Sequence, residues 1–324
     1  MTLTKLAEMA GTSVSTVSKA FAGSREISRQ TKERIFEVAR KLGCFEKYYK
    51  GPREAPIIAL VVPECESDYY ANEAGIFERE LSRRGADTLI ALTRFDRERE
   101  ARLFQELAYR MKVDGVIVFG NGTLIRNPDQ IPLVTLGFES ISANNADFIN
   151  TDLEKAISDA VLLLKEYGHK EIGFIGEELT IIKLKYFKKA LRYHGLPIND
   201  NMIVTVKERF YSGGQCGMKK IIESGTLPSA IITAYDDIAY GAMRYATSLG
   251  YKIPDDISFV GINDTYSNGY FDIPLTSVHI NLEDVCEEII DLIFRKIENR
   301  YFRSRTKITI PTSLKLRASL KKIK

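Results

Sequence analysis

Apolar residues recur at helical spacing in three short segments near the start of the chain. They stand three, four or seven positions apart, which is typical of amphipathic helices. The three stripes are Leu3, Leu6, Ala7 and Ala10, then Val17, Ala20 and Phe21, then Ile35, Val38, Ala39 and Leu42. Ser13 and Ser28 are favourable N-caps for the second and third helices, and Gly11 and Gly43 predict the ends of the first and third. The pattern therefore predicts three short helices that bury their apolar faces together.

The outward face of the second helix carries small hydroxyl side chains. In the segment GTSVSTVSKAFAG, burial of the apolar stripe leaves Ser15, Thr16, Ser18 and Lys19 facing outward. Short hydroxyls let a helix approach a DNA duplex closely and donate to phosphates or base edges. A solubilising surface explains them less well, because Ser and Thr are poor helix formers. Two short helices joined by a tight turn and supported by a third predict a helix-turn-helix, whose second helix lies in the major groove.

From residue 57 onward, apolar runs alternate with helical patterns such as the one from Ala74 to Arg84. Continuous apolar runs are expected for strands buried on both faces of a parallel sheet. The runs are PIIALVVPE, ADTLIAL, VDGVIVFG and IPLVTLG, followed by KEIGFIG, NMIVTV, SAIITA and DISFVGIN. This alternation predicts an α/β core of two doubly wound parallel-sheet subdomains, with a ligand cleft near the carboxyl ends of the strands.

Composition and charge narrow the class of protein. The chain has 324 residues, of which 44% are hydrophobic and 27% charged, as in ordinary globular proteins. It has no apolar run long enough to span a membrane and no signal-like start, so we expect a cytoplasmic protein with no membrane partner. Residues 1–54 hold 11 Lys and Arg against 6 Glu, although the formal net charge of the whole chain is only +3. The positive charge therefore belongs to the head, which favours a nucleic-acid partner.

The sequence carries no convincing catalytic, metal or cofactor motif. The four cysteines are too scattered for a metal knuckle and too few for a disulfide framework. The glycines of FGNGTL lack the rest of a dinucleotide-binding fingerprint. The three histidines show no metal-binding spacing, and no nucleophile stands in a convincing context with a base. We therefore expect no enzyme: no catalytic residue, no metal site and no cofactor.

The head resembles that of the lactose/galactose repressor (LacI/GalR) family of transcriptional regulators. The resemblance rests on LTKLAEMAGTSVSTVSKAFAG and ISRQTKERIFEVARKLG, and it continues through the whole chain. It implies a periplasmic-binding-protein-like core whose chain crosses between two subdomains three times, near residues 150, 277 and 304. The expected domains are a helix-turn-helix head at 1–46, a hinge linker at 47–56, a core N-subdomain at 57–150 and 278–303, and a core C-subdomain at 151–277 and 304–324.

The resemblance assigns roles in DNA binding to the second and third helices. It implies that three residues read bases: Val14, Ser15 and Lys19. It implies that five hydroxyl residues hold phosphates: Ser13, Thr16, Ser18, Ser28 and Thr31. Lys19 stands where the family frequently has Arg, so the charge is kept but the bidentate fork for guanine is lost. Ala22 stands where the family usually has Asn, which removes one polar backbone contact.

The linker, CFEKYYKGPREAP, departs from the hinge helix of the family. It is shorter, it has no Leu to wedge into the minor groove, and Gly51, Pro52 and Pro56 oppose a full helix. Tyr48 and Tyr49 are candidates for a minor-groove wedge, since apolar side chains can unstack a base step. A solvated linker whose tyrosines pack against the core explains them at least as well, so both alternatives stay open.

The resemblance also implies a small-molecule site in the cleft of the core. The candidate residues are Tyr69, Tyr70, Lys183, Tyr211, Tyr235, Asp236 and Asn263. Tyr69 and Tyr70 follow the first core strand and offer an aromatic wall for a ring. Three further candidates replace residues common in the family, with Lys for Arg, Tyr for Asn and Asn for Asp. These changes remove bidentate recognition and a negative charge, so an ordinary sugar pocket is not assumed.

These observations predict a sequence-specific DNA-binding transcriptional regulator, a repressor of sugar or related metabolic genes. Its expected partners are double-stranded DNA with a pseudo-palindromic operator, a second copy of the chain in a homodimer, and a small effector such as a sugar. Ligand binding would favour one orientation of the subdomains and so change the spacing of the two heads. The alternative is a stand-alone sugar-binding or sugar-processing protein, which explains the core but not the basic head.

Overall fold

The computed structural model describes most of the chain. The described residues are 2–24, 26–49, 55–120, 124–127, 129, 131–137, 146–269, 271–299 and 306–323. The chain divides into two compact units, Met1–Pro56 and Ile57–Lys324, which we call the head and the core and describe separately.

The described part of the head contains the three helices that the sequence predicts, followed by one further helical turn. They are α1 (Leu3–Met9), α2 (Val14–Phe21), α3 (Arg29–Lys41) and α4 (Phe45–Tyr48). The Ser13 hydroxyl accepts a hydrogen bond from the Thr16 amide, and the Ser28 hydroxyl accepts one from the Thr31 amide. Both predicted N-caps are therefore present. Gly11 follows α1 at φ +59°, in the left-handed conformation that favours glycine.

An aromatic cluster joins α4 to the apolar core of the head. Phe21 is buried, and its ring centroid lies 5.9 Å from that of Phe45 and 6.0 Å from that of Tyr48. Tyr49, just after α4, stacks on Phe45 at 4.8 Å. The two tyrosines of the predicted linker thus pack on aromatic residues of the head. The rest of that linker before Ala55, residues 50–54, lies outside the described residues.

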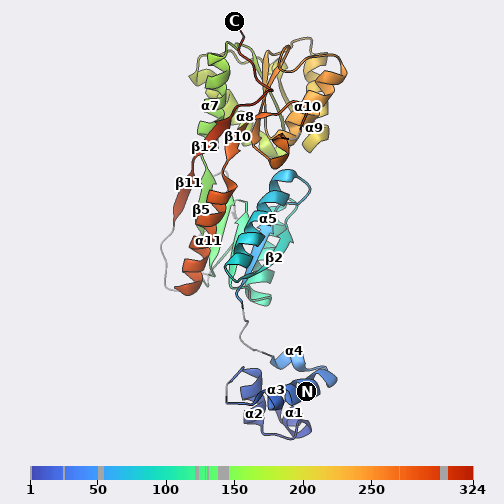
Figure 1. The fold of residues 1–324 in the computed structure, drawn as a ribbon, viewed down its shortest axis with the longest axis vertical. Coiled ribbons are helices and arrows are strands. Elements are labelled where there is room, and N and C mark those ends of the chain that lie inside the picture. The colour runs from blue at the N-terminus through green and yellow to red at the C-terminus, as the bar shows by residue number, and fades with distance from the viewer. Residues whose placement is uncertain are drawn as a thin grey trace. The chain divides into compact units, whose positions relative to one another are not determined.

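The first subdomain of the core is built on a six-stranded sheet in which every pairing is parallel. Its order is β11-β5-β4-β3-β1-β2. The strands are β1 (Ile57–Val62), β2 (Asp87–Leu92), β3 (Gly115–Phe119), β4 (Leu133–Gly137), β5 (Asp147–Thr151) and β11 (Lys307–Ile310). Helices α5 (Asp68–Arg83) and α11 (Leu282–Glu298) cover one face of the sheet (Figure 1). Helix α6 (Arg97–Gln105) covers the other face. Alternate residues of β1 therefore enter two different apolar clusters.

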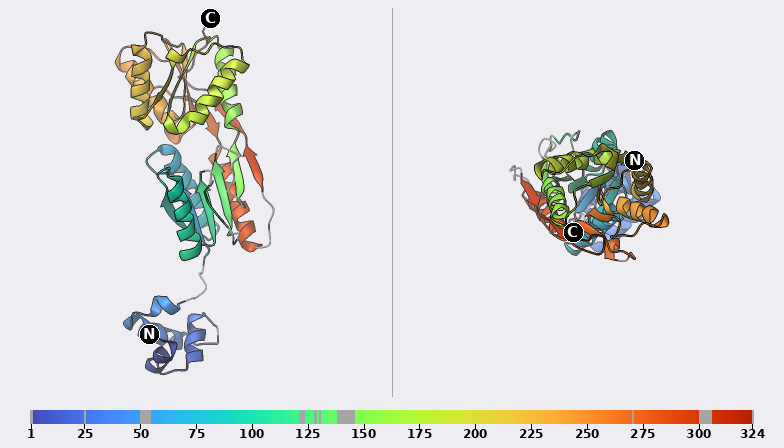
Figure 2. Two further views of the ribbon diagram at one scale, coloured as in Figure 1. Left: turned by 180° about the vertical axis from the view of Figure 1, so that it is seen from behind. Right: turned by 90° about the horizontal axis from the view of Figure 1, so that it is seen from above.

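The second subdomain repeats this arrangement. Its sheet has the order β12-β10-β9-β8-β6-β7, and β12 runs antiparallel to β10. The strands are β6 (Ile172–Glu177), β7 (Ile203–Val206), β8 (Ala230–Thr233), β9 (Ser258–Asn263), β10 (Thr276–Ile280) and β12 (Thr312–Lys315). The helices are α7 (Leu153–Glu166), α8 (Ile181–Tyr193), α9 (Phe210–Glu223) and α10 (Asp236–Ser248). The α7–α8 pair lies on one side of the sheet and the α9–α10 pair on the other (Figures 1 and 2).

The chain crosses between the two sheets three times. It leaves the first sheet after β5, returns to the first subdomain between β10 and α11, and crosses again between β11 and β12. The pairing of β10 puts residues 278–280 with the second sheet, and that of β11 puts residues 307–310 with the first. Both segments lie on the opposite side of the boundaries expected at 278 and 304. The physical reason is that a short strand pattern does not specify which sheet the strand joins.

Helices α9 and α10 pack with almost no space between their backbones. A Cβ atom on Gly214 would lie 2.0 Å from the carbonyl oxygen of Ile238, and one on Gly241 would lie 1.9 Å from that of Tyr211. Backbone carbonyls cannot rotate away from such a clash. These two glycines therefore set the spacing of the two helices.

Replacement of Gly241 by Ala should destabilise the core by about 1–3 kcal/mol, because the added methyl group forces the two helices apart. Gly75 on α5 is the matched control, since a Cβ there meets nothing within 4 Å. Gly75→Ala should stabilise the core by about 0.5–1 kcal/mol through helix propensity. Chemical denaturation of the full chain measures both. Equal effects of the two substitutions would contradict the close approach of α9 and α10.

Candidate functional site

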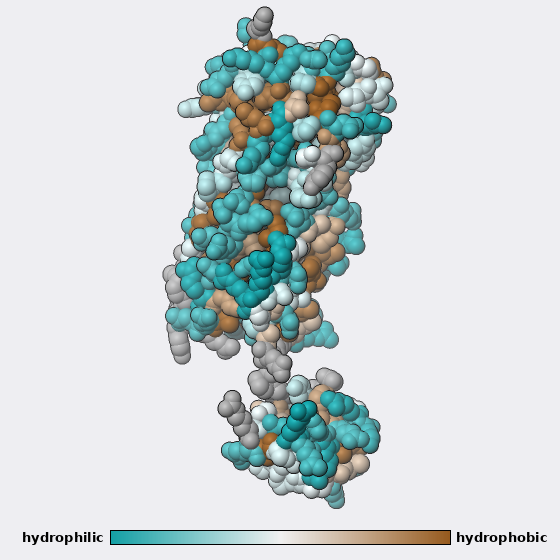
Figure 3. Space-filling model, in the orientation of Figure 1, coloured by the Kyte–Doolittle hydropathy of each residue, from teal (hydrophilic) through white to brown (hydrophobic). Residues whose placement is uncertain are grey.

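The second helix of the head has one apolar face and one hydroxyl face. Val17 and Phe21 point inward and are buried, whereas Ser15 and Ser18 are exposed. Val14 is 41% exposed although it is apolar, so an apolar side chain stands in the middle of the polar face. The visible surface of the head is otherwise mostly hydrophilic (Figure 3). An exposed methyl group among hydroxyls suits contact with a thymine methyl and with base edges.

Pairs of hydroxyl groups lie at the N-termini of α2 and α3. Ser13 Oγ lies 2.8 Å from Thr16 Oγ1, and Ser28 Oγ lies 2.9 Å from Thr31 Oγ1. The amides of a first helical turn and the helix dipole both favour a negative charge at this end. Four of the five residues proposed to hold phosphates are therefore located at such helix starts, and Ser18 lies further along α2.

Lys19 forms a salt bridge with a residue that the sequence analysis did not consider. Its Nζ lies 2.5 Å from Glu26 Oε2, and both side chains are exposed. The hydrogen bond and the positive charge of Lys19 lower the pKa of Glu26. Glu26 lies seven residues after Lys19, beyond the end of α2. A contact of this kind across a turn leaves no periodic signal in the sequence. The residue that we expect to read bases thus has a carboxylate competing for its ammonium group.

In the core, two adjoining cavities lie at the carboxyl ends of the parallel strands. The larger has a volume of about 230 Å³ and the smaller about 90 Å³. They share four lining residues: Tyr69, Tyr70, Phe95 and Leu179. The larger cavity is formed mostly by the first subdomain and the smaller mostly by the second. Their place agrees with the rule that open α/β sheets bind ligands where the strand order reverses.

Five of the seven effector candidates line these cavities. Tyr69 and Tyr70 line both, and they lie in the first turn of α5, which begins earlier than the predicted Ala74. The three that line only the smaller cavity are Lys183, Tyr235 and Asn263. Tyr211 is 44% exposed and is not among the lining residues.

Asp236 is fully buried and turned away from both cavities. Its carboxylate accepts hydrogen bonds from the Thr265 amide at 2.8 Å, from Ser277 Oγ at 2.6 Å and from Asn268 Nδ2 at 3.1 Å. It therefore holds the loop after β9 in place. The next residue, Asp237, lines the smaller cavity instead, because consecutive residues of a helix point in different directions. Burial raises the pKa of Asp236 to about 7 and that of Asp237 to about 6.

The smaller cavity contains buried polar atoms with no hydrogen-bond partner among the described residues. They are Asn263 Oδ1 and Arg209 Nε. The Arg209 guanidinium lies 4.3 Å from the ring centroid of Phe95, and its Nε is 3.6 Å from Glu177 Oε1, which is beyond hydrogen-bonding distance. Lys183 Nζ donates to the Ala234 carbonyl at 2.7 Å, and burial lowers the pKa of Lys183 to about 8. Unsatisfied buried polar atoms are costly, so this cavity is suited to a polar ligand.

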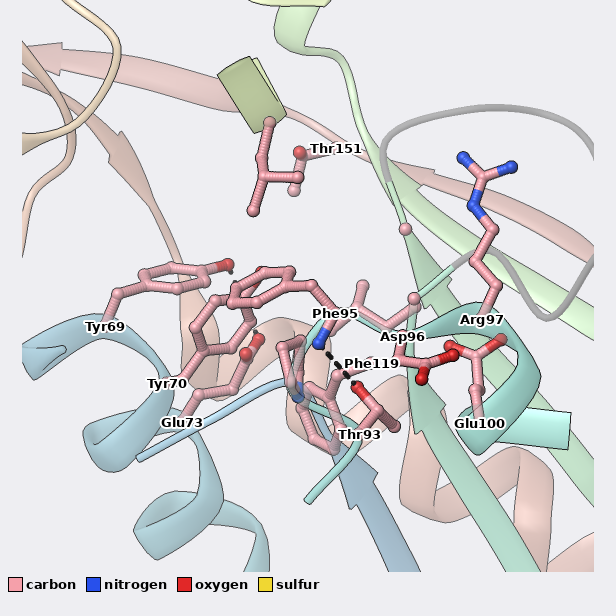
Figure 4. Close-up of a pocket in the computed structure, with 15 residues that line it drawn as sticks. Tyr69, Tyr70, Glu73, Thr93, Phe95, Asp96, Arg97, Glu100, Phe119 and Thr151 are labelled. Carbon is pink, nitrogen blue, oxygen red and sulfur yellow. Dashed lines mark hydrogen bonds between the residues drawn. The ribbon is translucent and has the colours of Figure 1, made fainter. Parts of the chain in front are cut away.

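The larger cavity combines aromatic walls with buried carboxyl groups. Figure 4 shows Glu73 beside Tyr70 and Glu100 on the far side of the cavity. Both glutamates are buried, and burial raises the pKa of Glu73 to about 8. The sequence analysis missed them, although one signal was present. Glu73 stands one helical turn after Tyr69 and one before Phe77, on the buried face of α5, where a charged residue is unusual.

No group of three or more His, Cys, Asp or Glu side chains in the described ranges is placed to hold a metal ion. None of the helices in those ranges has the length and apolar composition of a membrane span.

Both the head and the core of the chain match known protein families. Residues 2–44 match the bacterial regulatory proteins of the lacI family, and residues 161–320 match the periplasmic binding protein-like domain. The HTH-type transcriptional repressor PurR of Mannheimia succiniciproducens is 25% identical over 335 residues, which cover 99% of each chain. The chain belongs to the lacI family. It is a DNA-binding transcriptional regulator and not an enzyme, as predicted.

Two solved structures show the same fold as this lacI-family chain. The complex of the transcriptional regulator CelR with cellobiose has a TM-score of 0.69 at 24% identity and covers 99% of this chain and 100% of CelR. The lac repressor dimer bound to operator and an anti-inducer has a TM-score of 0.73 at 19% identity and covers 98% of each chain. The expected architecture, a helix-turn-helix head followed by a periplasmic-binding-protein-like core, is confirmed.

Replacement of Glu73 by Gln should make the core less sensitive to alkaline pH. The pKa of this carboxyl is raised from 4.5 to about 8 on folding, so its ionisation opposes folding increasingly as the pH rises from 4.5 to 8. Relative to the natural chain, Glu73→Gln should be equally stable at pH 5 and more stable at pH 8.5, by on the order of a few kcal/mol. Thermal denaturation without ligand measures this difference. Glu78→Gln, at an exposed position of the same helix, is the control and should change neither curve. If Glu73→Gln instead lowered the stability of the core by the same amount at pH 5 and at pH 8.5, this account would be wrong.

Proposed function

We propose that this regulator is a cytoplasmic repressor that binds a pseudo-palindromic operator as a homodimer. A small polar metabolite in the two adjoining cavities of the core modulates its affinity for DNA. The regulated genes act on sugars or related compounds. The exposed hydroxyl face of α2, opposite a fully buried apolar face, is the single observation that carries the DNA-binding part of this proposal.

The proposed contacts divide into two groups. Val14, Ser15 and Lys19 read base edges, because they project from the exposed face of α2. The hydroxyl pairs at the starts of α2 and α3, together with Ser18, hold phosphates. Two heads related by the dimer axis would meet two half-sites of the operator.

Tyr48 and Tyr49 remain proposed contacts for the minor groove. Tyr49 is 47% exposed, whereas Tyr48 packs on Phe21 in the apolar cluster of the head. Tyr49 is therefore the better placed of the two to reach a base step. To insert between two base pairs, the Tyr49 ring would have to leave its stacking contact with Phe45.

The ligand part of the proposal rests on Asn263 Oδ1 and Arg209 Nε, which are buried beside the smaller cavity without a hydrogen-bond partner among the described residues. A ligand that bridges residues of both subdomains would favour one of their relative orientations and so change the spacing of the heads. CelR, a structural neighbour of this chain, was solved with the disaccharide cellobiose. We therefore propose a small molecule rich in hydroxyl groups, bound by Tyr69, Tyr70, Lys183, Tyr235 and Asn263. Asp237 takes the place at this site that we expected for Asp236.

Selection of bound sites from random DNA, followed by mobility-shift assays with the full chain, tests the proposal. We expect a palindromic site whose affinity falls steeply with salt concentration. Equal affinity for selected and random DNA at moderate salt would overturn the proposed operator recognition.

Two substitutions in α2 should separate base reading from phosphate binding. Lys19→Ala should relax base choice at one position of each half-site, at about 1–3 kcal/mol for the preferred base. Thr16→Ala should weaken all sequences about equally, because phosphates carry no sequence information. Affinities for the selected site and for single-base variants of it measure both effects. A uniform loss for Lys19→Ala would show that this lysine contacts only phosphate.

Glu26→Gln should tighten DNA binding, because it frees Lys19 and removes a negative charge next to the DNA-binding face. Glu37→Gln is the matched control. Glu37 is also exposed and also pairs with a lysine, Lys41, at 2.7 Å, but near the C-terminal end of α3. We expect the Glu26 variant to gain affinity by about threefold or more at low salt, with a smaller gain at high salt. The same gain for both variants would assign the effect to net charge alone.

A further inference from the structure

We propose that the ligand of the core carries a protonated amine, which lies in the larger cavity against Glu73 and the tyrosine rings. This inference rests on the proposed function, because it specifies the chemical class of the ligand that the cavities take. It follows from the environment of Glu73, from the aromatic walls and from the distribution of charge between the two cavities.

Glu73 is a carboxyl group that is buried without a counter-ion among the described residues. Its side chain is 1% exposed and lines the larger cavity. The one hydrogen bond that the described residues offer it comes from the Tyr69 hydroxyl, at a long 3.5 Å. Burial shifts its pKa upward, and no cation of the described chain offsets that shift. A buried carboxylate is costly unless it is paired, so a ligand ammonium group would supply the missing positive charge.

Two of the three described cations that line the cavities belong to the smaller one. Lys183 and Arg209 line the smaller cavity, together with the two acids Glu177 and Asp237. Among the described residues, the larger cavity is lined by two buried acids, Glu73 and Glu100, and by an exposed pair of opposite charge, Asp96 and Arg97. The smaller cavity is therefore balanced in charge, whereas the larger one is acidic.

The carboxylate of Glu100 is held close to the end of β3. A Cβ atom on Gly120 would lie 2.5 Å from Glu100 Oε2, so the glycine leaves space for this carboxylate. Gly120 and Glu100 both line the larger cavity. A phosphate or carboxylate ligand would meet repulsion from these acids, and an ammonium group would meet attraction.

The walls of the larger cavity suit a cation as well. Tyr69 and Tyr70 lie edge to face at 5.1 Å between ring centroids, and Phe95 lies 6.0 Å from Tyr70. Figure 4 shows these rings gathered around one end of the cavity, on the side of Glu73. Aromatic faces attract ammonium groups through their quadrupoles, most strongly where water is excluded. The amine would thus occupy the larger cavity, and the hydroxyl groups of the ligand would extend toward Asn263 and Arg209 in the smaller one.

Matched pairs of small molecules test this inference on the full chain. The amines are glucosamine, galactosamine and 4-aminocyclohexanol, and their hydroxyl counterparts are glucose, galactose and cyclohexane-1,4-diol. Thermal shift and isothermal titration at pH 7 measure binding, since a ligand of the folded state raises its stability. We expect at least one amine to bind about tenfold or more tightly than its counterpart.

Two variants assign the effect to its residue. Glu73→Gln keeps the shape of the side chain and should reduce the affinity of that amine by about tenfold or more, while it leaves the affinity of the hydroxyl counterpart within about twofold. Glu78→Gln, exposed on the same helix, should leave both affinities unchanged. The ligand-free melting curve of each variant confirms that it is folded.

Each other outcome overturns the inference. Equal or tighter binding of the hydroxyl members would show that a neutral ligand occupies the cavity, and the proposed function would stand. Tighter binding of an amine that survives Glu73→Gln would place the amine elsewhere. If none of the amines bound, the inference that the ligand is an amine would be wrong. The proposed DNA recognition would be unaffected, because mobility shift measures it separately.

Discussion

The core depends on the requirement that its two mostly parallel sheets be covered by helices on both faces. A parallel sheet with apolar residues on both faces must be covered by helices on both faces, so its loops gather at the ends of its strands. Here two such sheets are joined by three crossings of the chain, and both cavities lie at the carboxyl ends of their strands. That constraint places the polar residues at strand ends in the cleft, such as Thr93 after β2 and Asn263 at the end of β9.

The buried polar groups of the core have two different tasks. Asp236 is satisfied by three donors and holds the loop that follows β9, so its burial stabilises structure. Asn263 Oδ1 and Arg209 Nε lack a partner among the described residues, and Glu73 has only a long one. A buried polar group left unpaired costs stability, and these three side chains line the cavities, where a ligand is able to pair with them.

The head depends on different physics because it is small. Its few buried residues are supplemented by an aromatic cluster that includes Tyr48 and Tyr49, the residues that in sequence follow the third helix as a linker. The exposed face of α2 is polar, and Lys19 on that face forms a salt bridge with Glu26. A salt bridge between exposed groups is weak, so DNA is able to compete for the lysine.

The sequence by itself determined the features that depend on neighbouring residues. These include the three helices of the head with both serine N-caps, and the eight quoted strand runs of the core. Five of seven effector candidates also line the cavities, since residues at strand ends gather at one edge of a sheet. Only the tertiary structure decided which sheet β10 and β11 join, which of Asp236 and Asp237 faces the cleft, and that Glu73 and Glu26 belong to the two sites. Strand pairing, helix rotation and contacts across turns bring together residues that have no periodic relation along the chain, and no local pattern encodes them.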